Sequence, residues 1–206
     1  MEIPAIYSVY RGGEIRAAPV DISGTNISFI SEPVPPAYSA EGFDERMSVL
    51  VVDVKGLGRK RLDDRLLMNM KFSGSDIWFM TFIKDVEDVF DCFMGNVVKV
   101  LMPYHTVRND IVPREVFEVT ENCIPVLFVL NGRVVCREEQ TEDIGEAIRE
   151  MERIGFREIA VLDIDYTLRD DDWASLHERS SGIIPFVRSR DKADRIAGFQ
   201  NIIIDF

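Results

Sequence analysis

The chain has 206 residues, of which 46% are hydrophobic, so it is long enough to bury the core of one domain. Its formal net charge of −12 repels phosphate backbones and anionic lipids, which argues against nucleic acid and membrane surfaces as partners. A small anionic metabolite stays compatible with this charge, because the local field of a site can oppose the field of the whole chain.

The composition also argues against a metal centre and a membrane anchor. Three cysteines and two histidines show no metal-ligand spacing, so we expect no metal and no other cofactor. The odd number of cysteines, lying in or beside apolar runs, favours reduced thiols and a cytoplasmic location. No apolar run reaches the roughly 18 residues of a membrane span, and the N-terminal sequence resembles neither a signal nor a transit peptide.

Eight short apolar runs, each of strand length, recur along the sequence. They are Ile3–Tyr7, Ser48–Val54, Asp76–Ile83, Val97–Tyr104, Ile124–Leu130, Glu158–Ile164, Ile183–Val187 and Asn201–Phe206. Most are nearly continuous Val, Ile, Leu and Phe, which is typical of parallel strands covered on both faces.

Segments with helical patterns lie between most of these runs. They are Arg61–Phe72, Val86–Met94, Pro113–Thr120, Thr141–Ile154, Trp173–Ser180 and Lys192–Gly198. In the clearest, Thr141 is the expected N-cap and Gly155 the expected end. The dipeptide Asn131-Gly132 predicts a tight reversal after the fifth strand.

This alternation predicts one domain over residues 1–206, an abbreviated (β/α)8 TIM barrel that ends at strand eight. A complete barrel has a helix after its last strand. Without that helix, the outer side of Ile202 or Ile203 would lack cover. We therefore expect a homodimer, in which a second copy covers this surface.

The segment Arg11–Glu45 interrupts the alternation with glycines, a proline cluster and, near Ala37–Phe43, a short helix pattern. It predicts a long loop after the first strand. Loops of this length are functional or flexible in many domains, but this one could equally cap the barrel mouth.

Four segments resemble the ProFAR isomerases of histidine biosynthesis, the HisA-like family. They are Ile3-Pro4-Ala5-Ile6 with Arg11-Gly12-Gly13-Glu14-Ile15-Arg16, Val51-Val52-Asp53-Val54-Lys55-Gly56, Asn131-Gly132-Arg133-Val134-Val135, and Leu162-Asp163-Ile164-Asp165-Tyr166-Thr167-Leu168. Their order and spacing run through nearly the whole chain. The resemblance implies a barrel whose site lies at the C-terminal ends of the strands.

The chain departs from this family where the family does its chemistry. The family uses two aspartates as general acid and base, but their positions here hold Tyr7 and Leu130 or Asn131. Its phosphate-binding glycine loops are replaced by Met80-Thr81-Phe82-Ile83-Lys84 and Phe186-Val187-Arg188-Ser189. We therefore do not expect the family's reaction.

The segment from Asp163 to Leu168 also resembles the D-x-D-x-T-L motif of haloacid-dehalogenase-like phosphatases. In that family the first aspartate attacks phosphorus and the second is an acid and base. The motif normally opens its domain. The residues after Leu168 are too few to supply the rest of such a domain.

Side-chain alternation predicts a polar cluster in the barrel mouth. Because buried carboxylates avoid an apolar helix layer, Asp163 and Asp165 should point inward. The same alternation points Asp53 and Lys55 inward, where Tyr7 and Thr81 would join them. If Leu101 faces inward, Lys99 lies near the floor of the barrel and His105 at its mouth. The predicted catalytic residues are Lys55, Asp163 and His105, and the predicted ligand-binding residues are Tyr7, Asp53, Thr81, Asp165 and Arg188.

Two interpretations of this cluster stay open. One is a small-molecule isomerase or lyase with a lysine and aspartate site. The other is a non-catalytic metabolite-binding or regulatory barrel in which the same charges form ion pairs. Arg188 could likewise clamp an anion or pair with nearby acids.

Overall fold

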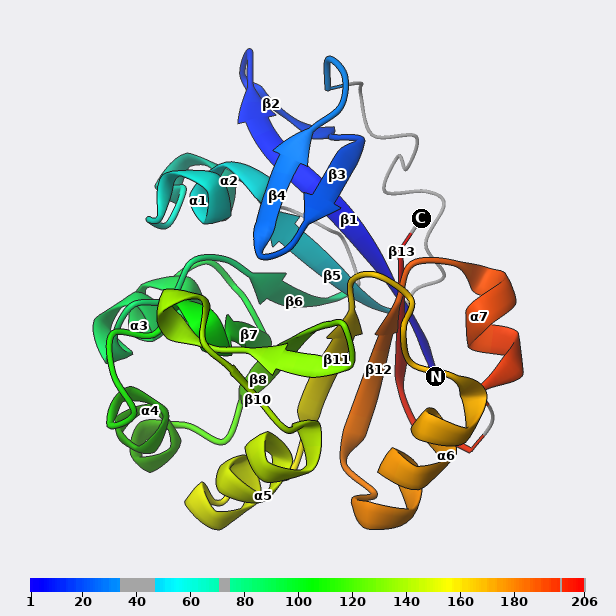
Figure 1. Cartoon of the computed structure of the whole chain (residues 1–206). Coiled ribbons are helices and arrows are strands. Elements are labelled where there is room, and N and C mark those ends of the chain that lie inside the picture. Colours follow the sequence, from blue (N-terminus) through cyan, green and yellow to red (C-terminus); the bar gives the residue numbers. More distant parts are fainter. Residues whose placement is uncertain (34–46, 71–74, 197, 206) are drawn as a thin grey trace.

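The structure is a computed structural model that describes residues 1–33, 47–70, 75–196 and 198–205. In this part of the chain eight parallel strands close into a barrel, because the last of them pairs with the first (Figure 1). In barrel order they are β1 (Glu2–Arg11), β5 (Ser48–Asp53), β6 (Asp76–Met80), β7 (Lys99–Pro103), β8 (Cys123–Leu130), β11 (Ile159–Asp163), β12 (Ile183–Val187) and β13 (Ile202–Asp205). The predicted strands and the α/β barrel are confirmed.

Helices follow the strands from β5 to β12 and surround the barrel. They are α1 (Val54–Arg59), α2 (Asp64–Asn69), α3 (Val86–Phe93), α4 (Val112–Val119), α5 (Ile144–Ile154), α6 (Asp170–Arg179) and α7 (Arg190–Arg195). None of the helices within the described ranges has both the length and the apolar character that crossing a bilayer requires.

The start of α5 differs from the prediction. Residues Thr141 and Glu142 form the short strand β10, which pairs with β9 (Arg133–Val135). The helix begins only after Asp143, whose side chain accepts a hydrogen bond from the backbone N–H of Glu146 at 3.1 Å. The N-cap is therefore Asp143, and the expectation of Thr141 was wrong because cross-strand pairing holds that residue extended.

The predicted reversal at Asn131-Gly132 is confirmed. These two residues connect β8 to the antiparallel β9, with φ of +52° and +70°. A two-residue turn of this hand requires positive φ at both positions, which Asn and Gly tolerate best.

Alternate residues of the barrel strands belong to two separate apolar cores. The inner core fills the barrel and contains Leu50, Leu101, Phe128, Leu162, Phe186 and Ile203 among others. The outer core lies between strands and helices, and contains Val51, Phe79, Val161 and Ile204 together with helix residues such as Leu66 and Ile148. A residue's place in this alternation therefore shows whether its side chain points into the barrel or toward the helices.

The segment after β1 is built of strands, where the sequence predicted a loop. β2 (Glu14–Ala17) runs antiparallel to the end of β1, and β3 (Val20–Ser23) pairs with β4 (Asn26–Phe29). Buried apolar side chains of this segment, Ala18, Val20, Ile22 and Ile27, belong to the inner core. Its described part therefore caps the barrel mouth, next to α1 (Figure 1). The short helix expected near Ala37–Phe43 lies outside the described residues.

Little of the surface expected to be bare beside the last strand is uncovered, because Ile202 is partly buried against the outer core. Ile203 points into the barrel and is fully buried, and Ile204 is buried in the outer core. The argument for a dimer through this surface therefore loses its basis, and the dimer itself stays a prediction.

Candidate functional site

Asp53, the last residue of β5, organises the loop that follows it. Its buried carboxylate accepts hydrogen bonds from the backbone N–H of Gly56 at 2.7 Å and of Asp63 at 3.0 Å, and from Thr81 Oγ1 at 2.8 Å. Asp53 thus fixes where α1 and α2 begin relative to β6. Burial raises the pKa of this carboxyl, although all three donors favour its charged form.

The structure brings Asp53 and Thr81 together, but on the helix side of the barrel. Asp53 lies on the face of Val51, and Thr81 on the face of Phe79, both of which belong to the outer core. The prediction that Asp53 and Thr81 point into the mouth was therefore wrong. At the end of a strand the outer face meets loop N–H groups as well as apolar helices, so a buried carboxylate can be satisfied there.

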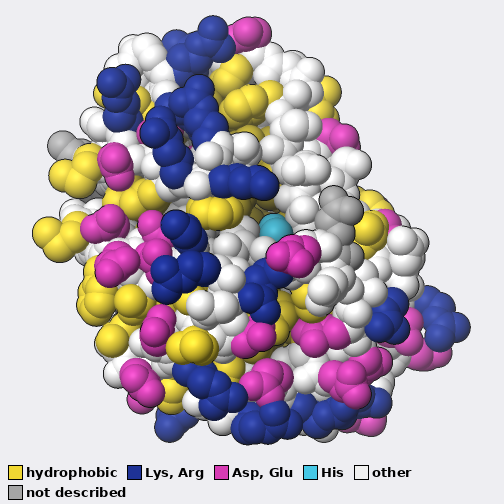
Figure 2. All heavy atoms as spheres, turned by 60° about the vertical axis from the view of Figure 1, so that its left-hand side comes forward, with side chains coloured by type: hydrophobic (Ala, Val, Ile, Leu, Met, Phe, Trp, Pro, Cys, Tyr) yellow, Lys and Arg dark blue, Asp and Glu magenta, His cyan; other side chains and the backbone are white. Residues whose placement is uncertain are grey.

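The loop held by Asp53 carries a cationic cavity, which we call the basic pocket. It has a volume of about 350 Å³ and is lined by Lys55, Arg59, Arg61, Leu62, Asp63, Asp64 and Arg65. Four cationic and two acidic side chains give this lining a formal charge of +2, in a chain of net charge −12. Figure 2 shows Lys and Arg side chains gathered in the upper part of the face that carries α1 and α2.

One pair within the basic pocket is neutralised. Lys55 Nζ lies 2.7 Å from Asp63 Oδ2, and Asp63 is buried. No ion pair in the described part of the chain involves Arg59, Arg61 or Arg65, all of which are exposed. The uncompensated charge of the pocket therefore resides on guanidinium groups, which bind carboxylates and phosphates through paired N–H donors.

The predicted catalytic residues Lys55, Asp163 and His105 are not brought together. Within the described residues, no hydrogen bond or ion pair joins any two of them. Lys55 is bound to Asp63 on the loop after β5. The other two lie on different elements, and each has different neighbours.

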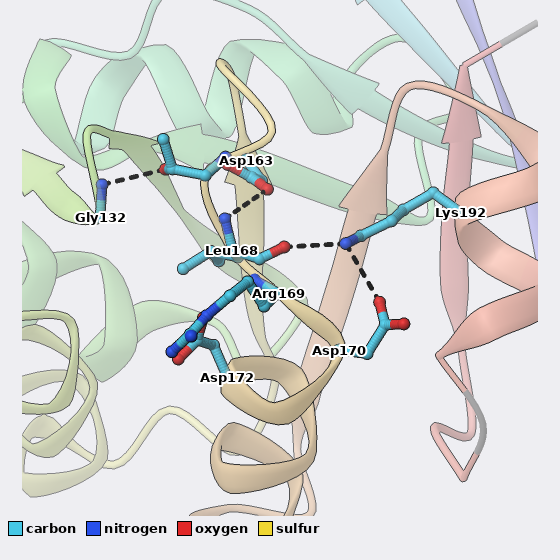
Figure 3. A network of polar contacts seen from close by, with 8 residues as sticks. Gly132, Asp163, Leu168, Arg169, Asp170, Asp172 and Lys192 are labelled. Atoms are coloured by element: carbon cyan, nitrogen blue, oxygen red, sulfur yellow. Dashed lines mark hydrogen bonds and ion pairs between the residues drawn. The ribbon is translucent and has the colours of Figure 1, made fainter.

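Asp163, the last residue of β11, lies on the helix side with Ile159 and Val161, not in the mouth as predicted. Its carboxylate accepts hydrogen bonds from the backbone N–H groups of Thr167 and Leu168, each at 3.1 Å (Figure 3). Burial raises its pKa despite these donors. Asp163 therefore folds the loop before α6.

Asp165 and Thr167 connect this loop to the β8–β9 turn. Asp165 accepts hydrogen bonds from the backbone N–H of Asn131 at 2.8 Å and from Thr167 Oγ1 at 2.9 Å. Thr167 Oγ1 in turn accepts one from the N–H of Gly132 at 3.0 Å (Figure 3). The D-x-D-x-T-L segment thus uses both carboxylates and its threonine to hold its own loop.

His105 lies at the barrel mouth and Lys99 near the floor, as predicted. The His105 ring packs against the inner-core residue Phe128, with 4.5 Å between ring centroids. Burial lowers the pKa of His105 to about 4, and its buried Nδ1 has no hydrogen-bond partner in the described part of the chain. Lys99 pairs with Glu158 and lies 4.7 Å from the ring centroid of Trp78.

Tyr7 and Arg188 point into the upper barrel, where they meet Asp205. Arg188 Nε lies 3.6 Å from Asp205 Oδ2, and the guanidinium packs 5.8 Å from the ring centroid of Tyr166. Burial, and then the charge of Asp205, raise the pKa of the Tyr7 phenol well above its ordinary value. Arg188 therefore forms an ion pair within the chain. This was the alternative interpretation to a role in binding an anion.

Sequence reasoning missed Asp205 and the three arginines of the basic pocket. The alternation Ile203-Ile204-Asp205 was a signal for the first, because an inward Ile203 places Asp205 inward. The run Arg59-Lys60-Arg61 in an acidic chain was a signal for the second.

The fold and the site define an α/β barrel with a cationic cavity at the C-terminal end of one strand. No protein-family model matches the chain, and no curated protein matches it. Among the described residues, no group of three His, Cys, Asp or Glu side chains is arranged to hold a metal ion.

Proposed function

We propose that this chain is a single (β/α)8 barrel of the TIM type, similar to the ProFAR isomerases, that binds a small anionic metabolite without catalysing that family's reaction. The positions of the resembling segments support the kinship. In barrel order they fall on the first strand, the end of the second, the turn after the fifth and the end of the sixth. Three unpaired cysteines agree with a cytoplasmic location as part of the proposal.

Two features favour binding over catalysis. Apolar side chains fill the barrel interior, and the β3–β4 hairpin continues this core across the mouth. The groups that could move protons lie apart and are held by structural contacts: Asp163 by backbone N–H groups, Lys55 by Asp63. A proton-transfer site needs such groups within hydrogen-bonding reach of one substrate.

The observation that carries the proposal is the basic pocket. Its net positive lining opposes the charge of the whole chain, and Arg59, Arg61 and Arg65 have no acidic partner in the described residues. It lies at the C-terminal end of β5, where barrels of this class place their sites. Asp53 and Gly56 fix the loop, so the cationic groups are held on an ordered support.

Binding of inorganic phosphate tests the proposal. We expect saturable binding at low ionic strength, measured by titration calorimetry, and a loss of about tenfold in affinity in an Arg59→Gln/Arg61→Gln double variant. Arg195→Gln is the control for loss of a surface positive charge away from the basic pocket. Arg195 is exposed on α7 and has no ion pair in the described structure. Absence of saturable binding, or equal losses in control and double variant, would contradict the proposal.

The alternative of a lysine-dependent isomerase or lyase makes a different prediction. Lys55 and Lys99 are both engaged in ion pairs, so we expect no Schiff base with small aldehydes or keto-phosphates. Borohydride trapping followed by intact-mass measurement checks this. A stable adduct that disappears in Lys55→Ala or Lys99→Ala would favour the enzyme instead.

A further inference from the structure

An apolar groove adjoins the basic pocket. It has a volume of about 560 Å³ and lies between β1, β4 and α1. Its apolar lining comes from Val9, Tyr10, Ile27, Phe29, Pro33 and Val54. Lys55 and Arg59 line both the groove and the basic pocket, so the two hollows share a wall.

From this shared wall we infer that the ligand is a phosphate monoester with an apolar body. This inference rests on the proposed function and names the class of ligand that the site binds. The phosphate would lie among the guanidinium groups of Arg59 and Arg61, and the body would lie along Phe29. A phosphate monoester carries a charge near −2 above its second pKa of about 6, which matches the +2 lining of the basic pocket.

The groove is suited to the apolar part of such a ligand, because its charged residues other than the shared Lys55 and Arg59 pair with each other. Its acidic residue, Glu32, forms an ion pair with Arg11, so these two charges cancel. The aromatic side chain of Phe29 is 44% exposed, so a ligand that packs against its ring would bury further apolar surface. β4 pairs only with β3 among the described strands, and α1 packs beside it.

The two hollows predict separable contributions to affinity. The phosphate would be bound by charge in the basic pocket, and the body by burial of apolar surface in the groove. A ligand that has both parts should therefore bind more tightly than phosphate alone, by about tenfold for one aromatic ring. Removal of Phe29 should affect only the second contribution.

Titration calorimetry with inorganic phosphate and phenyl phosphate at about pH 8, where both probes are mainly dianionic, tests this inference. We expect phenyl phosphate to bind about tenfold more tightly than phosphate to the unmodified chain. Phe29→Ser should remove most of that ratio while leaving phosphate binding unchanged, whereas Arg61→Gln should weaken both probes equally. Ile30→Ser is the matched control, because Ile30 is 67% exposed and does not line the groove.

The outcomes separate the inference from the proposed function. Equal affinity for both probes, or a ratio that survives Phe29→Ser, would overturn the apolar subsite while leaving the anion site in place. Failure of phosphate to bind at all, or binding that Arg61→Gln does not weaken, would overturn the proposed function itself.

Discussion

Replacement of Gly56 by alanine is expected to lower the free energy of unfolding by about 3 kcal/mol. A Cβ atom at this position would lie 1.9 Å from Asp53 Oδ2 and 2.7 Å from Thr81 Oγ1. The buried carboxylate would have to move, and its hydrogen bonds to Gly56, Asp63 and Thr81 would weaken together. Urea unfolding at neutral pH measures the change.

Gly58→Ala is the matched control in the same helix. A Cβ atom at Gly58 would have no neighbour within 4 Å, so this variant should be as stable as the original chain or slightly more stable. If both variants lost the same stability, the loss would not be specific to Gly56, and displacement of the Asp53 carboxylate would not explain it. The same pair of variants should also differ in phosphate affinity, because only Gly56→Ala displaces the loop that carries the basic pocket.

Acidification from about pH 7.5 to about pH 5 is expected to remove about 2 kcal/mol of stability through His105 alone. Burial lowers the pKa of His105 to about 4 in the folded chain, against an ordinary value of 6.5. Between these values the unfolded chain binds more protons than the folded chain, so stability falls as pH falls. The buried Nδ1 without a partner in the described structure gives the protonated ring no compensating acceptor.

The measurement compares the pH dependence of unfolding in the original chain and in His105→Gln. Burial raises the pKa values of Asp53, Asp163 and Glu142, which gives stability changes of the opposite sign in acid. These carboxyls are present in both proteins, so their contribution cancels in the difference. Parallel pH profiles would show that His105 titrates normally and is not buried as described.

The fold could be predicted well from the sequence because strand length and apolar character are local properties. Each predicted barrel strand overlaps an observed one, and Asn131-Gly132 forms the predicted turn. The strands β2, β3 and β4 were missed because they are short and gain their stability from pairing with each other and with β1. Such pairing depends on tertiary contacts and leaves little signal in the local pattern.

The candidate site was predicted less well, for an identifiable physical reason. The inward assignment of Asp53 and Asp163 assumed that the outer face of every strand meets only apolar helices. Both residues end their strands, where backbone N–H groups of the next loop satisfy the carboxylates. The charge pattern Arg59-Lys60-Arg61 lies at the cationic cavity, to which strand alternation gave no pointer.

Backbone amide NMR spectra recorded during a titration with phenyl phosphate test the central claim most directly, because they locate the bound anion on the chain. Our account predicts that the largest shift changes occur in the loop from Lys55 to Arg65 and along β4, which line the basic pocket and the apolar groove. Shift changes concentrated at the barrel mouth around His105 and Arg188, or no saturable changes in the Lys55 to Arg65 loop, would contradict it.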